Sequence, residues 1–252
     1  MKIHFALVSF FLYISFSTAQ SIQGQVVYTA TTDLSEYLEK VKANTNMTDV
    51  QREAKINNIE SSEPMKFKLS FNQKEAIYKS YLSMEELRRL GKLMNQTGFL
   101  GGYQYTFYTN RETKENFYQY FFTKEVLIKQ KDIPWELTSE SKKIGKYTCY
   151  KAVADMGSIK TLNKVHLGPV VAWYTPEIPI SYGIQGYNGL PGLTLELIAN
   201  YDEGQIFFNA TSIDLNPKQD IKIKKPKGKL ITAEEYNALR KKMNEIRDSR
   251  RN

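Results

Sequence analysis

The stretch Met65-Lys-Phe-Lys-Leu-Ser-Phe71 places an apolar side chain at every second residue. This alternation is typical of a β-strand with one buried and one solvated face. The next such run, Ala76-Ile-Tyr-Lys-Ser-Tyr81, follows after a short connection at Asn72 and Gln73. Because a connection this short joins antiparallel neighbours, the two stretches predict a β-hairpin.

Similar apolar and aromatic runs recur on both sides of this hairpin, separated by short polar turns, as in antiparallel sheets. The chain contains 17 tyrosines and 13 phenylalanines, which favour strands. Further strands are predicted at residues 25–29, 103–109, 116–122, 125–129, 135–139, 146–154, 170–174, 193–200 and 205–213. This pattern predicts an α+β, mainly β fold: a curved, half-barrel-like antiparallel sheet of about 8–11 strands with a few helices on one side.

Two segments depart from the strand pattern. Within residues 33–62, apolar side chains recur at helical spacing between positions 34 and 41, which predicts one or two helices. Residues 84–95 are amphipathic, with leucines at every third position, and the glycines at 98, 101 and 102 are expected to end that helix. We expect this second helical segment to cover the sheet or to act as a short lid.

The first twenty residues have the three parts of a secretory signal peptide. Lys2 is followed by an uncharged apolar run at residues 5–16, and then by the small residues Ser17 and Ala19. The run is shorter than the roughly 20 residues that a membrane-spanning helix needs. We therefore predict a signal peptide at residues 1–19 and export of a soluble chain, with a retained membrane anchor as the alternative.

Composition and charge divide the exported chain into two parts. The whole chain has 35 Lys and Arg, 27 Asp and Glu, and 41% apolar residues, an ordinary globular composition that excludes wholesale disorder. Residues 218–252 hold twelve basic and five acidic residues, so the excess charge lies at the end. We predict a single mainly β domain at residues 20–217 and a basic tail at residues 218–252.

The basic tail suggests either a partner or simple solubility. Clustered positive charge attracts nucleic acid, an anionic membrane surface or an acidic protein patch. Because an exported protein meets little nucleic acid, we expect no nucleic acid partner. Within the tail, residues 221–226 alternate isoleucine and lysine before a proline, which predicts an edge strand blunted by charge.

The end of the tail predicts an amphipathic helix with a largely basic outer face. Thr232 and Glu235 have the spacing of a capping box. The apolar stripe that follows consists of Tyr236, Leu239, Met243 and Ile246. Either this stripe packs back on the sheet, or it binds a partner such as an outer-membrane protein.

The segment from residue 173 to residue 196 is rich in glycine, proline and apolar residues. It runs from Trp173-Tyr-Thr-Pro-Glu177 to Gly189-Leu-Pro-Gly-Leu193. Pro191 and Gly192 suit the central positions of a type II turn, in which the glycine takes a positive φ. Leu190 and Leu193 either pack under a neighbouring strand or line the rim of a groove for an acyl chain or an extended peptide. The candidate ligand-binding or loop residues are Trp173, Glu177, Gly189, Leu190, Pro191, Gly192 and Leu193.

On these residues the chain resembles the GLPGLI family of exported Bacteroidota proteins. Trp135 and residues 142–152 and 172–175 support the resemblance, whereas Ile184 and Thr194 depart from the usual family pattern. The resemblance implies a location in the periplasm or cell envelope of a Gram-negative, Bacteroidota-like bacterium, and it implies no activity. A weaker likeness, in strand order and aromatic content, is to the half-barrels of lipoprotein carriers.

The residues of the exported chain do not support an enzyme, a metal site or a cofactor. His166 is its one histidine and Cys149 its one cysteine, and the spacings of metal sites are missing. We expect Cys149 to be a buried, inert thiol. An enzyme that uses Glu177, or Cys149 paired with His166, is kept as a remote alternative.

These observations leave two principal hypotheses for function. The first is a periplasmic, non-catalytic binding or accessory protein that shelters an apolar or extended ligand, such as a lipid, an acyl chain or a peptide, in the concave sheet. The second is an interaction module whose C-terminal helix docks on an outer-membrane receptor or an envelope assembly.

Overall fold

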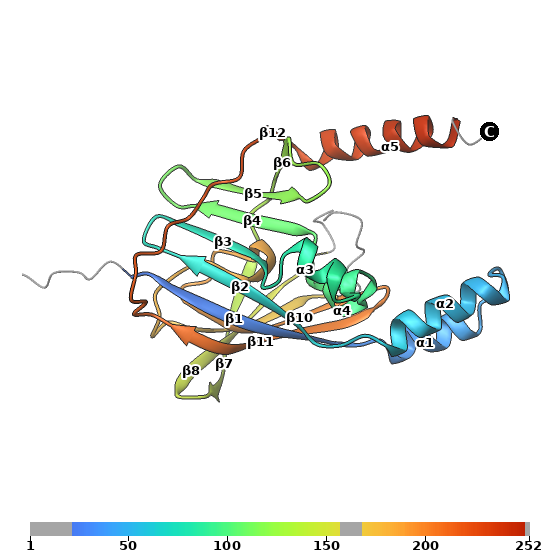
Figure 1. Ribbon diagram of the computed structural model, residues 1–252. Coiled ribbons are helices and arrows are strands. Elements are labelled where there is room, and N and C mark those ends of the chain that lie inside the picture. Colours follow the sequence, from blue (N-terminus) through green and yellow to red (C-terminus); the bar gives the residue numbers. More distant parts are fainter. Residues whose placement is uncertain (1–21, 157–167, 250–252) are drawn as a thin grey trace, which may run out of the picture.

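The computed structural model describes residues 22–156 and 168–249, and the strands within them form one twelve-stranded sheet (Figure 1). Along the sheet the strand order is β12-β6-β5-β4-β3-β2-β1-β11-β10-β9-β8-β7. The bounds are β1 Gly24–Asp33, β2 Met65–Phe71, β3 Glu75–Ser80, β4 Tyr105–Asn110, β5 Glu115–Tyr120, β6 Val126–Lys129, β7 Trp135–Ile144, β8 Tyr147–Ala154, β9 Val170–Thr175, β10 Leu193–Tyr201, β11 Gly204–Asp214 and β12 Lys229–Ile231. The predicted mainly β fold is confirmed, with one strand beyond the expected range.

Strand β1 joins the two halves of this sheet. It pairs antiparallel with β2 on one side and with β11 on the other, so the first strand meets the last long strand. Tyr28 of β1 lies opposite Phe67 of β2, and its buried hydroxyl donates to the carbonyl oxygen of Thr194 at 2.8 Å. On either side of β1 the neighbouring strands are consecutive in sequence until β12, because short turns connect them.

The helices predicted before and after the first hairpin are present, with different bounds. Helices α1 (Ser35–Lys42) and α2 (Asp49–Glu60) form a hairpin that extends beyond the sheet (Figure 1). The single helix predicted at 84–95 is instead α3 (Met84–Arg89) followed by the 3-10 turn η1 (Lys92–Met94). Gly91 interrupts it with a φ of 67°, which glycine adopts without strain.

Helix α4 (Gln96–Gly101) lies where the glycines were expected to end a helix. Asn95 caps it by accepting a hydrogen bond from the Gly98 amide at 2.9 Å. A Cβ on Gly101 would come within 2.4 Å of the Phe67 ring. Gly98 and Gly101 therefore permit close packing of α4 on the sheet, so their interpretation as helix breakers was wrong, whereas Gly102, with a φ of 74°, ends the helix as expected.

The concave, inner face of the sheet is covered by α4 and by the segment between β9 and β10, residues 176–192, which contains the 3-10 turn η2 (Ile184–Gly186). The rings of Phe67 and Tyr78 stack on this face with their centroids 5.7 Å apart. Tyr182, Ile184 and Tyr187 of the covering segment are buried in the same cluster. The inner face is thus the hydrophobic core, and the protein's own side chains occupy it.

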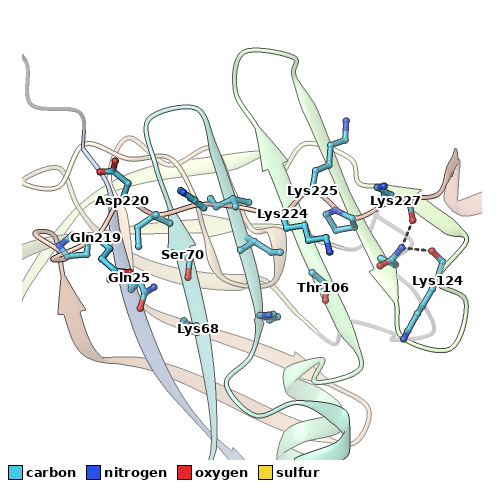
Figure 2. Close-up of a pocket in the computed structure, with 18 residues that line it drawn as sticks. Gln25, Lys68, Ser70, Thr106, Lys124, Gln219, Asp220, Lys224, Lys225 and Lys227 are labelled. Atoms are coloured by element: carbon cyan, nitrogen blue, oxygen red, sulfur yellow. Dashed lines mark hydrogen bonds between the residues drawn. The ribbon is translucent and has the colours of Figure 1, made fainter.

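The tail contains the largest departure from the predicted secondary structure. Residues 221–226 are not a strand; they cross the strands of the sheet instead of running parallel to them (Figure 2), and the edge strand is β12, parallel to β6. Helix α5 (Ala233–Ser249) begins at the predicted capping box and extends away from the sheet (Figure 1). None of the helices in the described residues has the length and apolarity needed to cross a membrane.

Candidate functional site

A segment that we name the strap, residues 217–228, crosses the outer face of the sheet from β1 toward β6 (Figure 2). At its first end the amide of Ile221 donates to Oε1 of Gln23 at 2.9 Å, and its carbonyl oxygen accepts from Nδ2 of Asn72 at 3.3 Å. Both backbone groups of Ile221 are hydrogen-bonded, as they would be in a strand, but their partners are side chains and not a neighbouring strand. The alternating sequence can therefore lie here without pairing with the sheet.

At its other end the strap is fixed by one amide and one apolar contact. Nε2 of Gln119 donates to the carbonyl oxygens of Lys227 at 2.8 Å and Lys124 at 2.6 Å (Figure 2). Ile223 packs on the buried outer cluster that consists of Tyr108, Phe117 and Leu127. The strap is therefore held at both ends over the sheet.

Lys225 adds an ion pair to this second attachment. Its ammonium group bonds the carboxylate of Glu115 and lies 5.9 and 6.0 Å from the ring centroids of Tyr108 and Phe117. The pKa of Glu115 is lowered, first by the hydrogen bond from Lys225 and then by the one from Thr113. Lys225 is thus neutralised within the protein.

A groove of about 1230 Å³ lies under the strap, between the strap and the strands (Figure 2). Its wall on the sheet side follows from the strand register, since Lys68 lies opposite Lys79, Lys79 opposite Thr106, and Thr106 opposite Gln119. The lysines that line it are Lys68, Lys79, Lys124, Lys222, Lys224, Lys225 and Lys227. The neutral polar residues are Gln25, Ser70, Thr106, Gln119 and Gln219.

The groove carries a positive charge that the described residues barely compensate. Asp220, near one end, is its one acidic lining residue among them, and Lys225 is the lining lysine paired with Glu115. Lys68 and Lys79 face each other directly across two strands, an arrangement that destabilises a sheet. The ammonium group of Lys68 also lies 5.7 Å from the ring centroid of Tyr81, and a hollow lined mainly by charges of one sign attracts ions of the opposite sign.

The structure also locates the charge of the basic tail. Residues 218–229 contain six lysines and one aspartate, whereas α5 contains four basic and four acidic residues. The predicted basic outer face of the helix is therefore balanced by acidic residues over its described length. The excess charge lies in the strap, over the lysines of the sheet.

The predicted site at the turn of residues 189–193 is packed into the protein. Leu190 is 1% exposed and Leu193 is fully buried. Leu190 contacts a small cluster with Ala152, Ala172 and Tyr174 against Trp135. Of the two alternatives for these leucines, the structure has the packed one; ligand binding at this turn stays a prediction.

The predicted type II turn at Pro191 and Gly192 is wrong, because Gly192 does not have a positive φ. A Cβ on Gly192 would lie 2.1 Å from the carbonyl oxygen of Thr175. The positive φ belongs to Gly189, at 101°. Gly192 is thus required by the close approach of two backbones and not by the turn type.

Trp173 and Glu177 make local contacts on the strands beside this turn. The ammonium group of Lys142 lies 4.3 Å from the ring centroid of Trp173 and bonds the carboxylate of Glu196 at 2.7 Å. Oε1 of Glu177 accepts a hydrogen bond from the amide of Thr148 at 2.8 Å. These contacts join β7 to β9 and β10, and join β8 to the loop after β9; ligand binding by Trp173 and Glu177 stays a prediction.

Cys149 is buried in the core cluster, as predicted. Burial raises the pKa of its thiol to about 11, so the nucleophilic thiolate is disfavoured at neutral pH. His166, its hypothetical partner, lies outside the described residues. Among those residues, no group of three or more His, Cys, Asp or Glu side chains is arranged to hold a metal ion.

The predicted partner-binding stripe of α5 is divided by its environment. Tyr236, next to the sheet, is 5% exposed and belongs to the core cluster. Leu239, Met243 and Ile246 are 46%, 59% and 45% exposed. Of the four residues of the stripe, Tyr236 is thus the one that packs back on the sheet.

The sequence interpretation missed the groove, although one signal was present. The alternation of isoleucine and lysine at 221–226 indicates a segment with one face on an apolar surface, which fits the strap as well as an edge strand. The polar faces of β2 and β3 carry Lys68 and Lys79, but only the register shows that they meet.

Comparison with known proteins identifies a family of unknown function and two remotely similar structures. No curated protein matches the sequence. Solved structures of PNGF-II in the P21 and C2 space groups are 16% and 15% identical, with TM-scores of 0.48 and 0.47. In each case 86% of this chain is covered and 32% of the PNGF-II chain, so the chain spans about a third of their length. Residues 160–196, which include the turn at 189–193, match the family Porph_ging, described as "Protein of unknown function", and this match confirms the family resemblance found on the same residues.

Proposed function

We propose that the protein is exported by the signal peptide at residues 1–19 and acts in the periplasm or cell envelope as a non-catalytic binding protein for an anionic ligand. The observation that carries this proposal is the lysine-lined groove under the strap. The envelope location is supported by the pattern of residues 1–19 and by the family resemblance.

The lysines of the groove act together because they are close. Neighbouring strands are about 4.8 Å apart, which is less than the Debye length of about 8 Å at physiological ionic strength. The potentials of Lys68 and Lys79 on the sheet therefore add to those of Lys222 and Lys224 on the strap. An anion in the groove would gain from all four charges and relieve the repulsion among them.

This proposal moves the ligand from the inner face of the sheet to the outer face. An apolar ligand on the inner face would have to displace Tyr182, Ile184 and Tyr187, which are buried there. The groove under the strap needs no such displacement. We accordingly retain the binding-protein hypothesis and change the chemistry of its ligand from apolar to anionic.

The test is the binding of the mature chain, residues 20–252, to poly-glutamate at physiological salt. The double variant Lys79→Gln with Lys224→Gln removes two charges that line the groove. At 0.5–1 kcal/mol for each lost charge contact, its affinity should fall roughly tenfold. The matched control, Lys40→Gln with Lys241→Gln, removes two exposed charges on α1 and α5 and should bind like the wild type. Equal losses in both double variants, or a wild type that does not bind, would refute the proposal.

A second candidate function is docking through α5, and a specific observation favours it. Leu239, Met243 and Ile246 are about half exposed on a helix that extends beyond the sheet (Figure 1). An outer-membrane protein would bind this stripe by burying it. Replacing the three residues with serine should release the exported protein from the outer-membrane fraction without lowering its stability. Unchanged retention of that variant would exclude this role.

A further inference from the structure

The length of the groove suits a short segment of extended chain. The groove is lined from Gln25 on β1 to Gln119 on β5, and these strands are consecutive neighbours in the sheet (Figure 2). Four spacings of about 4.8 Å give a length of about 19 Å. An extended peptide rises about 3.3 Å per residue, so about six residues would cross the groove.

The lysines stand on both sides of this path. Lys222 and Lys224 are exposed and alternate with Ile221 and Ile223, which are half-buried against the sheet. In an extended chain every second side chain has the same direction, with a repeat of about 6.6 Å. A ligand with a carboxylate at every second residue would match this alternation.

The neutral residues of the groove favour a ligand that both donates and accepts hydrogen bonds. Ser70 and Thr106 have hydroxyl groups that can do either. Both N–H groups of the Gln119 amide are engaged with carbonyl oxygens, whereas its Oε1 accepts no hydrogen bond from the described residues. A peptide backbone supplies the missing N–H donor, which a chain of phosphates or sulfates does not.

The lining also argues against two other polymers. Among the described residues that line the groove, none is aromatic. Single-stranded nucleic acids gain much of their affinity by stacking bases on aromatic side chains, and sugar rings pack their apolar faces on the same groups. A peptide requires no aromatic surface, because its charged side chains and main chain make the contacts.

From these observations we propose that the groove under the strap binds an extended acidic segment of a partner protein, with Asp or Glu at every second position. This inference rests on the proposed binding of an anionic ligand. The main chains of β2, β3 and β4 are already paired on both sides, so the segment lies across the strands and is held by side chains of the sheet. Recognition therefore differs from strand addition at a sheet edge.

The experiment compares two peptides of equal composition, each about eight residues long, enough to span the groove. One alternates glutamate and serine, and the other has all glutamates in one block. Calorimetric titration of the mature chain at physiological salt should give an affinity for the alternating peptide about tenfold higher, equivalent to one well-placed charge contact. The variant Lys79→Gln with Lys224→Gln should lose that preference, and the control Lys40→Gln with Lys241→Gln should keep it.

Two further probes separate the failure of this inference from that of the proposed function. Equal affinity for the two peptides, or tighter binding of inorganic polyphosphate or oligogalacturonate, would overturn the extended-peptide inference and leave anion binding intact. If neither the peptides nor the two polyanions bind, both proposals fall.

Discussion

The inner and outer faces of the same strands differ in the side chains that they carry. On β2, Phe67 is fully buried between the sheet and α4, whereas its neighbour Lys68 faces the groove. The inner face is filled by the protein's own aromatic and aliphatic side chains, as an interior at close-packed density must be. The outer face keeps like charges beside one another, which no packing requirement explains. The larger core thus lies on the inner face, and the charged part of the outer face is available for binding.

The largest expected effect tests the inner face. Phe67→Ala removes a ring that stacks on Tyr78 and meets Phe208 edge to face. Its loss leaves a cavity, and the free energy of unfolding should fall by about 3–5 kcal/mol. Chemical denaturation measures this, with Lys68→Ala as the matched control on the same strand, expected to change stability by at most about 1 kcal/mol. Equal losses of stability in the two variants would contradict the proposed difference between the faces.

Much of the inner face could be predicted from the sequence. The alternation at 65–71 indicates which side chains are buried, and β2 has those bounds. Helix α4 could not be predicted, because Gly98 and Gly101 are poor helix formers that are needed here for the contacts of the helix with Tyr103, Met65 and the Phe67 ring. Intrinsic helix propensity is overridden where close packing leaves no space for a Cβ atom.

The outer face was harder to predict, because its groove depends on distant parts of the chain. Lys68 and Lys79 meet through the register of β2 and β3, and the strap adds Lys222 and Lys224 from about 150 residues further along. An alternating sequence indicates one apolar face, but it does not indicate the direction in which the segment crosses a sheet. A site formed by strand register and by a crossing segment therefore cannot be recognised from the local sequence pattern.

A second prediction concerns the turn at residues 189–193. Gly192→Ala places a Cβ against the carbonyl oxygen of Thr175, so the backbone must shift, at a cost of about 1–3 kcal/mol in the free energy of unfolding. Gly145→Ala is the control: nothing lies within 4 Å of its Cβ, and its φ of 57° alone should cost about 1 kcal/mol. Thermal and denaturant unfolding would compare them. A Gly192→Ala protein as stable as the wild type would show that this turn is not packed as described.

A third prediction uses the buried thiol. The pKa of Cys149 is raised, mainly by burial, from 9.0 to about 11 in the folded protein, so the folded state holds its proton to higher pH than the unfolded state does. The contribution of the thiol to stability is therefore complete below pH 9 and is lost as the pH rises toward 11. Wild type should lose stability relative to Cys149→Ala across this range, and the comparison cancels the buried tyrosines common to both proteins. Parallel pH profiles would place the thiol in contact with solvent.

The smallest expected effect concerns the repulsion between Lys68 and Lys79 on the outer face. Because Lys68 and Lys79 oppose each other across β2 and β3, replacing either with glutamine should raise stability by about 0.2–1 kcal/mol at low salt. The second replacement should add less than the first, since the repulsion is already relieved, and a double-mutant cycle measures this coupling. High salt should remove this coupling by screening.

The same substitutions of Lys68 and Lys79 are expected to weaken the binding of poly-glutamate, so each variant would gain stability and lose affinity together. If the two lysines proved uncoupled, or if stability and affinity fell in parallel, the charged row would be ordinary solvated surface and not a face kept at a cost for binding.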